Sequence, residues 1–94
     1  MPTFAFMGFD KANALDIRVA TRSDHLAYMK DFGAQIRYGG PLLDENEAMC
    51  GSLIVVETPD RAAAEAIFAN DPYRAAGLFE RTELLGLRPV LGQP

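Results

Sequence analysis

His25 is the single histidine of this chain, and its imidazole is the side chain best suited to acid–base chemistry near neutral pH. A neutral imidazole can accept a proton and return it, as general acid–base catalysis requires. Asp71, in the segment Asn70-Asp71-Pro72-Tyr73, could orient this imidazole by accepting a hydrogen bond from its second ring N–H. Two alternatives stay open at this point. His25 could be an exposed helical residue without a task, and Asp71 could only initiate an Asp-Pro turn.

Two arginines stand close to His25 in the sequence and could bind an anionic substrate. A guanidinium recognises a carboxylate or a phenolate through paired hydrogen bonds, and Arg18 and Arg22 flank the entry to the first predicted helix. Ion pairs with Asp16 or Asp24 are the more ordinary explanation for their presence. We therefore predict Arg18 and Arg22 as substrate-binding candidates, with surface ion pairing as the alternative.

Three further residues are predicted to contact a substrate. Ser52 offers a hydroxyl and Tyr73 a phenol, while Gly40 allows close approach of the backbone. Glycine pairs are also common in ordinary turns, which is the alternative for Gly40. Cys50 is not expected to act as a nucleophile, because no cation adjoins it in the sequence. One cysteine and one histidine are too few for a structural zinc site, and no glycine-rich phosphate motif is present, so we expect neither a metal nor a cofactor.

Four apolar stretches, which must help to position these residues, have the composition of β-strands. The first and third are apolar at both alternating positions, which is typical of strands buried on both faces. The predicted strands cover residues 3–9, 35–39, 51–58 and 78–88, with a loop at 40–50 between the second and the third.

Two helices are predicted between these strands. The first begins at the capping pattern Thr21-Arg22-Ser23-Asp24 and ends at Gly33. This start places His25 near a helix N-terminus, where the helix dipole favours the neutral imidazole. The second helix begins with Thr58 as N-cap and Pro59 at the first helical position, and it ends before Pro72.

The resulting order, β-α-β-β-α-β, predicts an α+β fold of the ferredoxin-like kind, with a four-stranded antiparallel sheet and both helices on one face. The 94 residues are expected to form a single domain, residues 1–94. A domain of this size buries only about 60 to 65% of the surface of its unfolded chain, so an enclosed pocket within one protomer is not expected.

The face of the predicted sheet that no helix covers must pack against another surface, because the first and third strands are apolar at both alternating positions. We predict a homodimer formed by sheet-to-sheet packing, since two-fold dimers are the commonest soluble assemblies. The alternative is that the loop 40–50 folds over this face.

The charge balance excludes several classes of partner. Nine Lys and Arg against thirteen Asp and Glu give a net charge of −4, the wrong sign for binding nucleic acid or an anionic membrane. No segment approaches the roughly 20 apolar residues of a membrane span, and the N-terminus lacks the pattern of a signal peptide. With its single cysteine, the chain is expected to be a soluble cytoplasmic protein.

Taken in order, short motifs along nearly the whole chain resemble the YciI-like (YCII-related domain) family of small bacterial proteins. The motifs are Asp10-Lys11, Arg22-x-x-His25, Gly39-Gly40-Pro41, Gly51-Ser52, Asp71-Pro72-Tyr73 and Ala76-Gly77-Leu78-Phe79. The chain departs from the usual pattern in its tail, where Leu87-Arg88-Pro89-Val90 replaces a lysine-containing segment, and in a shorter loop at 42–50.

The resemblance implies a ferredoxin-like α+β barrel built from a dimer, with a pocket between sheet and helices. His25 matches the histidine of the family and Asp71 the aspartate of its Asp-Pro-Tyr motif, while Ser52 and Tyr73 fall at positions that line the pocket. One branch resembles dehydrochlorinases of chlorinated hydroxyquinols, and related folds include muconolactone isomerases, so the resemblance implies proton transfer on a small cyclic substrate.

Two functions follow as hypotheses. The first is a cofactor-independent lyase or isomerase in which His25 moves a proton, Asp71 orients the imidazole and Ser52 or Tyr73 contacts the substrate. The second is a non-catalytic binding or accessory protein whose pocket holds a small metabolite. A purely structural dimerisation module is the remaining alternative.

Overall fold

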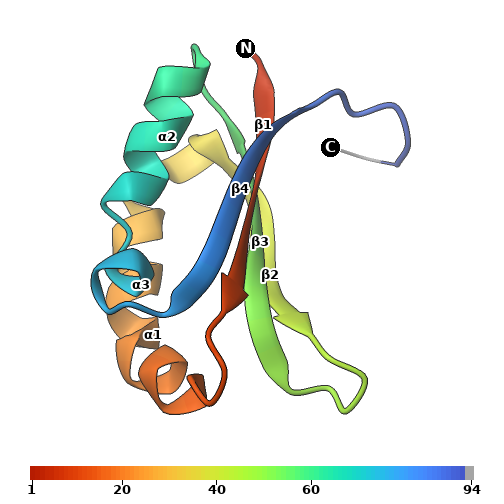
Figure 1. Ribbon diagram of the computed structural model, residues 1–94. Coiled ribbons are helices and arrows are strands. Elements are labelled where there is room, and N and C mark those ends of the chain that lie inside the picture. The colour runs from red at the N-terminus through yellow and green to blue at the C-terminus, as the bar shows by residue number, and fades with distance from the viewer. Residues whose placement is uncertain (93–94) are drawn as a thin grey trace.

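The four strands form one antiparallel sheet in the order β2-β3-β1-β4, and all the helices lie on one of its faces (Figure 1). In this computed structural model residues 1–92 are described, so residues 93–94 of the predicted domain lie outside the described part. The elements are β1 (Thr3–Asp10), α1 (Leu15–Lys30), the 3-10 helix η1 (Gly33–Gln35), β2 (Ile36–Leu43), β3 (Met49–Glu57), α2 (Arg61–Ala69), α3 (Pro72–Ala75) and β4 (Phe79–Leu87). The predicted ferredoxin-like fold is confirmed, with η1 and α3 as additional short helices.

The core fills the space between the sheet and the helices. Alternate residues of the two central strands point toward the helices, so that Phe4 and Phe6 of β1 lie beside Val56 and Ile54 of β3. Phe6 stacks on Phe68 of α2 with ring centroids 4.2 Å apart. Met29 of α1 and Ala64 and Ile67 of α2 complete this cluster. A smaller cluster of Ala14, Tyr73 and Leu78 packs at the start of α1.

The first helix begins at Leu15 rather than at Thr21, so the predicted start was wrong. The segment Thr21-Arg22-Ser23-Asp24 has the composition of a capping box, but it lies within α1 because nothing in it breaks a helix. The preceding turn is formed by Asn13 with a φ of 59°, and Ala14 after it is buried against Tyr73 and Leu78. His25 therefore lies in the second half of α1, and the predicted effect of the helix N-terminus on its imidazole does not apply.

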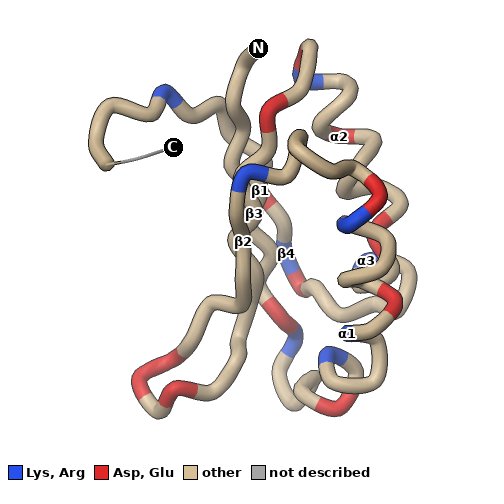
Figure 2. Tube along the Cα trace, turned by 180° about the vertical axis from the view of Figure 1, so that it is seen from behind, with Lys and Arg blue, Asp and Glu red and all other residues tan. Residues whose placement is uncertain are grey.

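The second and third strands form a long hairpin, so the predicted loop at 40–50 is mostly strand. Only residues 44–48 form the turn, in which the Asp44 carboxylate accepts hydrogen bonds from the backbone N–H groups of Asn46 and Ala48 at 2.8 and 3.0 Å. The acidic residues at this tip are visible in Figure 2. Pro41 is tolerated inside β2 because β2 is an edge strand. The segment thus extends the sheet and does not fold over its uncovered face.

The second long helix is capped by Asp60 and not by Thr58 as predicted. The Asp60 side chain accepts a hydrogen bond from the backbone N–H of Ala63 at 2.8 Å. Thr58 is fully buried, and its hydroxyl donates to the carbonyl of Asp60 at 2.7 Å. Asn70 and Asp71 end α2 as predicted, but Pro72 also begins α3, with Asp71 as its N-cap.

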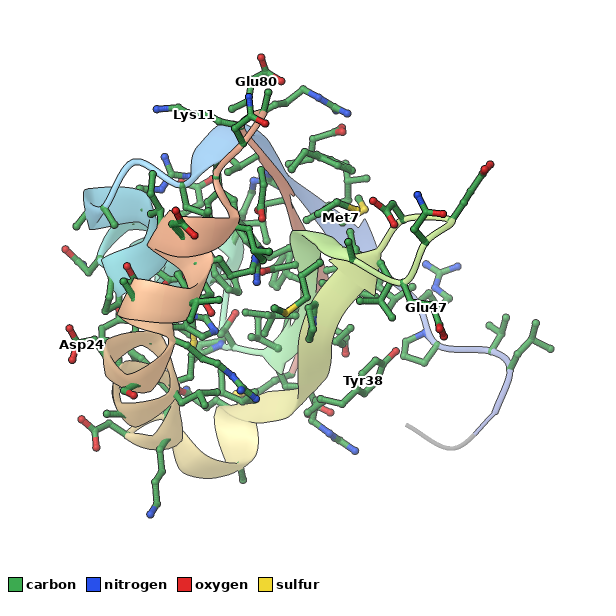
Figure 3. The ribbon with its side chains drawn as sticks, turned by 90° about the horizontal axis from the view of Figure 1, so that it is seen from below. Met7, Lys11, Asp24, Tyr38, Glu47 and Glu80 are labelled. Atoms are coloured by element: carbon green, nitrogen blue, oxygen red, sulfur yellow. The ribbon has the colours of Figure 1, made fainter. Side chains whose placement is uncertain are left out.

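The face of the sheet away from the helices, here termed the open face, carries apolar side chains. Its apolar residues come from all four strands: Ala5, Met7, Phe9, Tyr38, Leu53, Val55, Leu85 and Leu87; Thr3, Glu57, Arg81 and Glu83 lie on the same face. Figure 3 shows Met7 and Tyr38 on the side of the sheet opposite the helices. The exposed fractions are 54% for Tyr38 and 51% for Leu85. In residues 1–92, no helix has the length and apolar character that crossing a membrane requires.

Candidate active site

His25 and Asp71 are hydrogen-bonded to each other, although 46 residues separate them in the chain. The distance between His25 Nδ1 and Asp71 Oδ1 is 2.8 Å, and the side chains are 10% and 1% exposed. An ionised carboxylate can only accept a hydrogen bond, so we assign the proton of the neutral imidazole to Nδ1. The lone pair is then on Nε2, the nitrogen that does not contact Asp71.

Asp71 is held in place by the local structure at the start of α3. Its Oδ1 also accepts the backbone N–H of Tyr73 at 3.0 Å, which is the N-cap hydrogen bond of that helix. Its Oδ2 is buried and has no hydrogen-bond partner within residues 1–92. A carboxylate hydrogen-bonded to one ring nitrogen holds the imidazole in one orientation.

Tyr73 fixes the plane of the imidazole by stacking against it. The two ring centroids lie 4.0 Å apart with an interplanar angle of 16°. On α1, Arg18 lies about two turns before His25, and its guanidinium carbon is 4.9 Å from the centroid of the Tyr73 ring. Tyr73 therefore packs between the two side chains of α1. Burial raises the pKa of the Tyr73 phenol, so this group stays neutral at physiological pH.

Arg18 does not pair with Asp16 or Asp24, the partners considered from the sequence. Its Nε and Nη2 donate to the two oxygens of Asp10, each at 2.8 Å, and Nη2 also donates to Ser52 Oγ at 3.0 Å. Burial alone lowers the pKa of Arg18, but the ion pair with Asp10 outweighs it and keeps the pKa above its ordinary value. Arg18 is thus a permanent cation, and Asp10 and Ser52 fix its position.

A cleft of about 270 Å³ opens between the inner face of α1 and strands β2 and β3. The candidates His25, Arg18, Arg22, Ser52, Tyr73 and Gly40 all line it, together with Leu26, Met29, Ile36, Gly39, Pro41, Met49 and Ile54. Asp71 lies behind His25, outside the lining. The residues of one chain line this cleft, which stays open on one side and is not the enclosed pocket that a domain of this size was not expected to form.

Arg22 lies at the exposed side of the cleft, one turn after Arg18 on α1. It forms no ion pair within the described residues, and Asp24 projects from the outer side of α1 (Figure 3). Because Asp10 neutralises Arg18, Arg22 carries the uncompensated charge of the lining. The apolar lining residues and this one cation suit a small ring compound that carries an anionic group.

Comparison with known proteins identifies the family of this chain. The model of the YCII-related domain matches residues 3–88. The chain belongs to the YCII-related domain family. Protein YciI of Escherichia coli O6:H1, a relative of this YCII-related chain, is 33% identical over 89 residues, which cover 86% of this chain and 91% of that protein.

Two solved structures share the fold of this YCII-related chain. One is the 5-chloro-2-hydroxyhydroquinone dehydrochlorinase TftG from Burkholderia phenoliruptrix AC1100, in complex with 2,5-dihydroxybenzoquinone. It is 29% identical, with a TM-score of 0.82 over 96% of this chain and 95% of that one. An antibiotic biosynthesis monooxygenase, 15% identical with a TM-score of 0.61 over 97% of this chain and 100% of that one, shares the fold alone.

Asp10 is the residue of the site to which sequence reasoning gave no role. It entered only as part of the Asp10-Lys11 motif, and its pairing with Arg18 depends on the path of the chain after β1. The sequence nevertheless contains a helical spacing that places residues of the site on one face of α1. Arg18, His25 and Met29, the buried residues of α1, are spaced by seven and four residues, so they fall on one helix face. The helix start assigned to Thr21, six residues too late, left Arg18 outside the predicted helix and hid this pattern.

Proposed function

We propose that this protein is a cofactor-independent lyase or isomerase that transfers a proton on a small cyclic or aromatic substrate. The observation that carries the proposal is the hydrogen bond of 2.8 Å between His25 Nδ1 and the buried Asp71, beside a cleft of about 270 Å³. A histidine oriented by a carboxylate at the wall of an apolar cleft is a typical general acid–base arrangement.

In the proposed reaction, Nε2 of His25 accepts a proton from the substrate while Asp71 stabilises the imidazolium. The bond broken is the C–H bond of a saturated ring carbon next to a carbonyl, such as the keto tautomer of a hydroxylated ring provides. In a lyase, the electron pair of this bond forms a new double bond as the leaving group departs with the electrons of its own bond, and His25 later releases its proton to water. In an isomerase, the carbonyl oxygen holds the electron pair as an enolate until His25 returns the proton to another atom of the same molecule. Both courses use the same base and need no redox step.

The likeness to the dehydrochlorinase TftG supports the lyase course, because removal of hydrogen chloride is an elimination of this type. The likeness extends over nearly the whole of both chains. We therefore propose hydroxylated or chlorinated ring compounds as the substrate class. In the proposed complex, Arg22, Tyr73 and the backbone at Gly40 contact the ring, and Arg18 acts mainly through Ser52.

We also propose that the protein is a homodimer formed by sheet-to-sheet packing of the open face. The apolar side chains of all four strands support this proposal, since Tyr38 and Leu85 are more than half exposed in the single chain. Exposed apolar side chains on such a face gain free energy when a second copy covers them.

The test is turnover of a panel of chlorinated and hydroxylated aromatics and lactones by the wild type and by His25→Gln. We expect product from at least one compound, and a loss of about 10²- to 10⁴-fold in kcat in the variant, the usual contribution of a general base. Asp24→Asn, one residue earlier on the outer side of α1, is the matched control and keeps full activity. Equal turnover by His25→Gln and the wild type would contradict the proposal.

The same panel distinguishes the alternative of a non-catalytic binding protein. If the wild type forms no product from any compound, yet binds one of them and loses that binding in His25→Gln, the cleft is a metabolite-binding site and not an active site.

A further inference from the structure

The hydroxyl of Tyr28 supplies a hydrogen-bond donor that the end of α2 lacks. The last carbonyls of a helix have no partner within that helix. In a longer α2, the N–H of Asp71 would donate to the carbonyl of Ile67, four residues earlier, but it donates to the carbonyl of Phe68 at 3.3 Å. The Tyr28 hydroxyl donates to the Ile67 carbonyl at 2.6 Å in its place. A side chain of α1 therefore completes the turn that leads from α2 to Asp71.

This contact lies one helical turn away from the contact between His25 and Asp71. On α1, Tyr28 follows His25 by three residues, and on the other segment Ile67 precedes Asp71 by four. The two hydrogen bonds, of 2.6 and 2.8 Å, therefore join the same two segments at successive turns. Two contacts in this arrangement limit both the sliding and the rotation of one segment against the other.

The ring of Tyr28 is held independently of its hydroxyl. It packs edge-on against Phe32, with ring centroids 5.1 Å apart, and it lies against the larger of the two core clusters. This aromatic packing does not need the oxygen atom. The substitution Tyr28→Phe therefore removes the hydrogen bond to Ile67 and leaves the ring in place.

We propose that Tyr28 is a positioning residue, whose hydroxyl keeps the Asp71 carboxylate at Nδ1 of His25. With the Tyr28 hydroxyl on the Ile67 carbonyl, the N–H of Asp71 stays with Phe68. Without that hydroxyl, the donor that helix geometry offers to the Ile67 carbonyl is the N–H of Asp71. Such a bond would lengthen α2 by one residue and move the carboxylate away from the imidazole.

The residue that would change conformation is Asn70, the C-cap of α2. Pro72 keeps Asp71 in an extended conformation whether α2 is lengthened or not. Asn70 has a φ of −105° and a ψ of 10°, which would shift to helical values. The effect of Tyr28 on catalysis rests on the proposed function, but its effect on the contact between His25 and Asp71 does not.

The first test is the rate at which the Nδ1 proton of His25 exchanges with water, followed by NMR in the wild type and in Tyr28→Phe. The exchange is expected to be about tenfold faster in the variant, the effect of weakening one hydrogen bond. Tyr38→Phe is the matched control, because it removes the same hydroxyl from a ring on the open face, and it keeps the wild-type rate. Circular dichroism verifies that both variants are folded.

The second test is turnover of the compound that the substrate panel identifies. Tyr28→Phe is expected to lower kcat about tenfold and to leave KM within about twofold, because Tyr28 lies outside the cleft lining and acts through the geometry of the base. In an Asp71→Asn background, the same substitution is expected to change kcat by less than about twofold, because its effect passes through the carboxylate.

The proposal fails if the Nδ1 proton of folded Tyr28→Phe exchanges as slowly as that of the wild type, or if Tyr38→Phe speeds the exchange equally. It also fails if Tyr28→Phe lowers kcat by the same factor with and without Asp71→Asn, since the hydroxyl would then act only through general stability. If the exchange rate changes as expected but no compound is turned over, the proposed enzymatic function is wrong, whereas Tyr28 is supported as the residue that positions the His25–Asp71 pair of a binding site.

Discussion

At the scale of residues, the site depends on which groups can donate and which can accept. Asp71 accepts from both the imidazole of His25 and the backbone of Tyr73, so its oxygen is fixed from two directions. Arg18 donates to Asp10 and Ser52, so the serine oxygen is an acceptor there. The direction of each hydrogen bond thus follows from the side-chain types and leaves Nε2 of His25 free to accept.

The first prediction concerns the tautomer of His25. In the wild type, the nitrogen-15 NMR spectrum is expected to show a protonated Nδ1 and an unprotonated Nε2, because Asp71 can only accept. In Asp71→Asn the amide can donate to Nδ1, so the proton is expected to move to Nε2 and kcat to fall by about 10⁴-fold. Because the same oxygen, Oδ1, accepts from His25 and from the Tyr73 N–H, an amide that donates to Nδ1 gives up the N-cap hydrogen bond of α3, and circular dichroism checks that the fold persists. A wild-type spectrum with the proton on Nε2 would mean that Asp71 does not orient the imidazole.

The second prediction concerns stability at alkaline pH. Burial raises the pKa of Tyr73 and of Tyr28, so the folded protein holds these phenolic protons more tightly than the unfolded chain does. This contribution to stability is fully present below the unfolded value of about 10 and is lost as the pH rises through the folded pKa. Each tyrosine then lowers the free energy of unfolding by up to about 1.4 kcal/mol per pH unit.

The measurement is the denaturant midpoint of the wild type and of Tyr73→Phe at about pH 9 and about pH 11. The variant is expected to lose less stability between these two conditions, because phenylalanine has no proton to release. An alkaline loss as large as that of the wild type would show that Tyr73 is not responsible.

At the scale of elements, α1 and the segment from α2 to α3 position the site. The inner face of α1 carries Arg18 and His25, and the short turn between α2 and α3 presents Asp71 and Tyr73 to them. Tyr28 of α1 also donates a hydrogen bond of 2.6 Å to the carbonyl of Ile67 in α2, which ties the two helices together. The geometry of the His25–Asp71 pair therefore depends on how these helices pack on the sheet.

The third prediction tests the start of α2. Asp60→Ala removes the side-chain acceptor for the Ala63 N–H and is expected to lower the free energy of unfolding by about 1 kcal/mol. Asp60→Asn, which keeps an acceptor at the same place, is expected to lose only a few tenths of that amount. Thermal or denaturant unfolding followed by circular dichroism measures both. Equal losses in the two variants would argue against a capping role.

At the scale of the whole molecule, the helices cover one face of the sheet, and the opposite face is the open face. The C-terminal segment after β4 runs across the end of the sheet and away from the helices (Figure 1). A second cleft of about 250 Å³ lies there, lined among others by Tyr38, Val55 and Val90. This surface lies on the side of the sheet opposite the candidate site, so an interface there leaves the cleft around His25 accessible.

The fourth prediction is that the protein sediments as a dimer at micromolar concentration and that Leu85→Arg makes it a monomer. A charge buried in an apolar interface must be desolvated without a partner, which costs several kcal/mol. Val19→Arg is the control, because Val19 is 60% exposed on α1 and lies outside the open face. A wild-type monomer would contradict the proposed sheet-to-sheet packing, whereas a monomeric Val19→Arg would place the interface on the helices.

The sequence by itself determined the order of the strands and main helices, the fold class and the family. These follow from local apolar periodicity and from short motifs, which depend on neighbouring residues. It also singled out His25 and Asp71, because residue type limits the chemistry that a side chain can do. The start of α1 was predicted wrongly, since a capping pattern at Thr21 is indistinguishable from exposed helix surface without knowledge of what α1 packs against.

Only the tertiary structure decided how the groups meet. The 2.8 Å contact between His25 and Asp71 spans 46 residues, and the contact between Arg18 and Ser52 spans 34. Asp10 became part of the site because the chain turns back at Asn13 and brings α1 alongside the end of β1. Distances of this kind depend on how helices pack on the sheet, and that packing is the sum of many contacts in the core that no local pattern encodes.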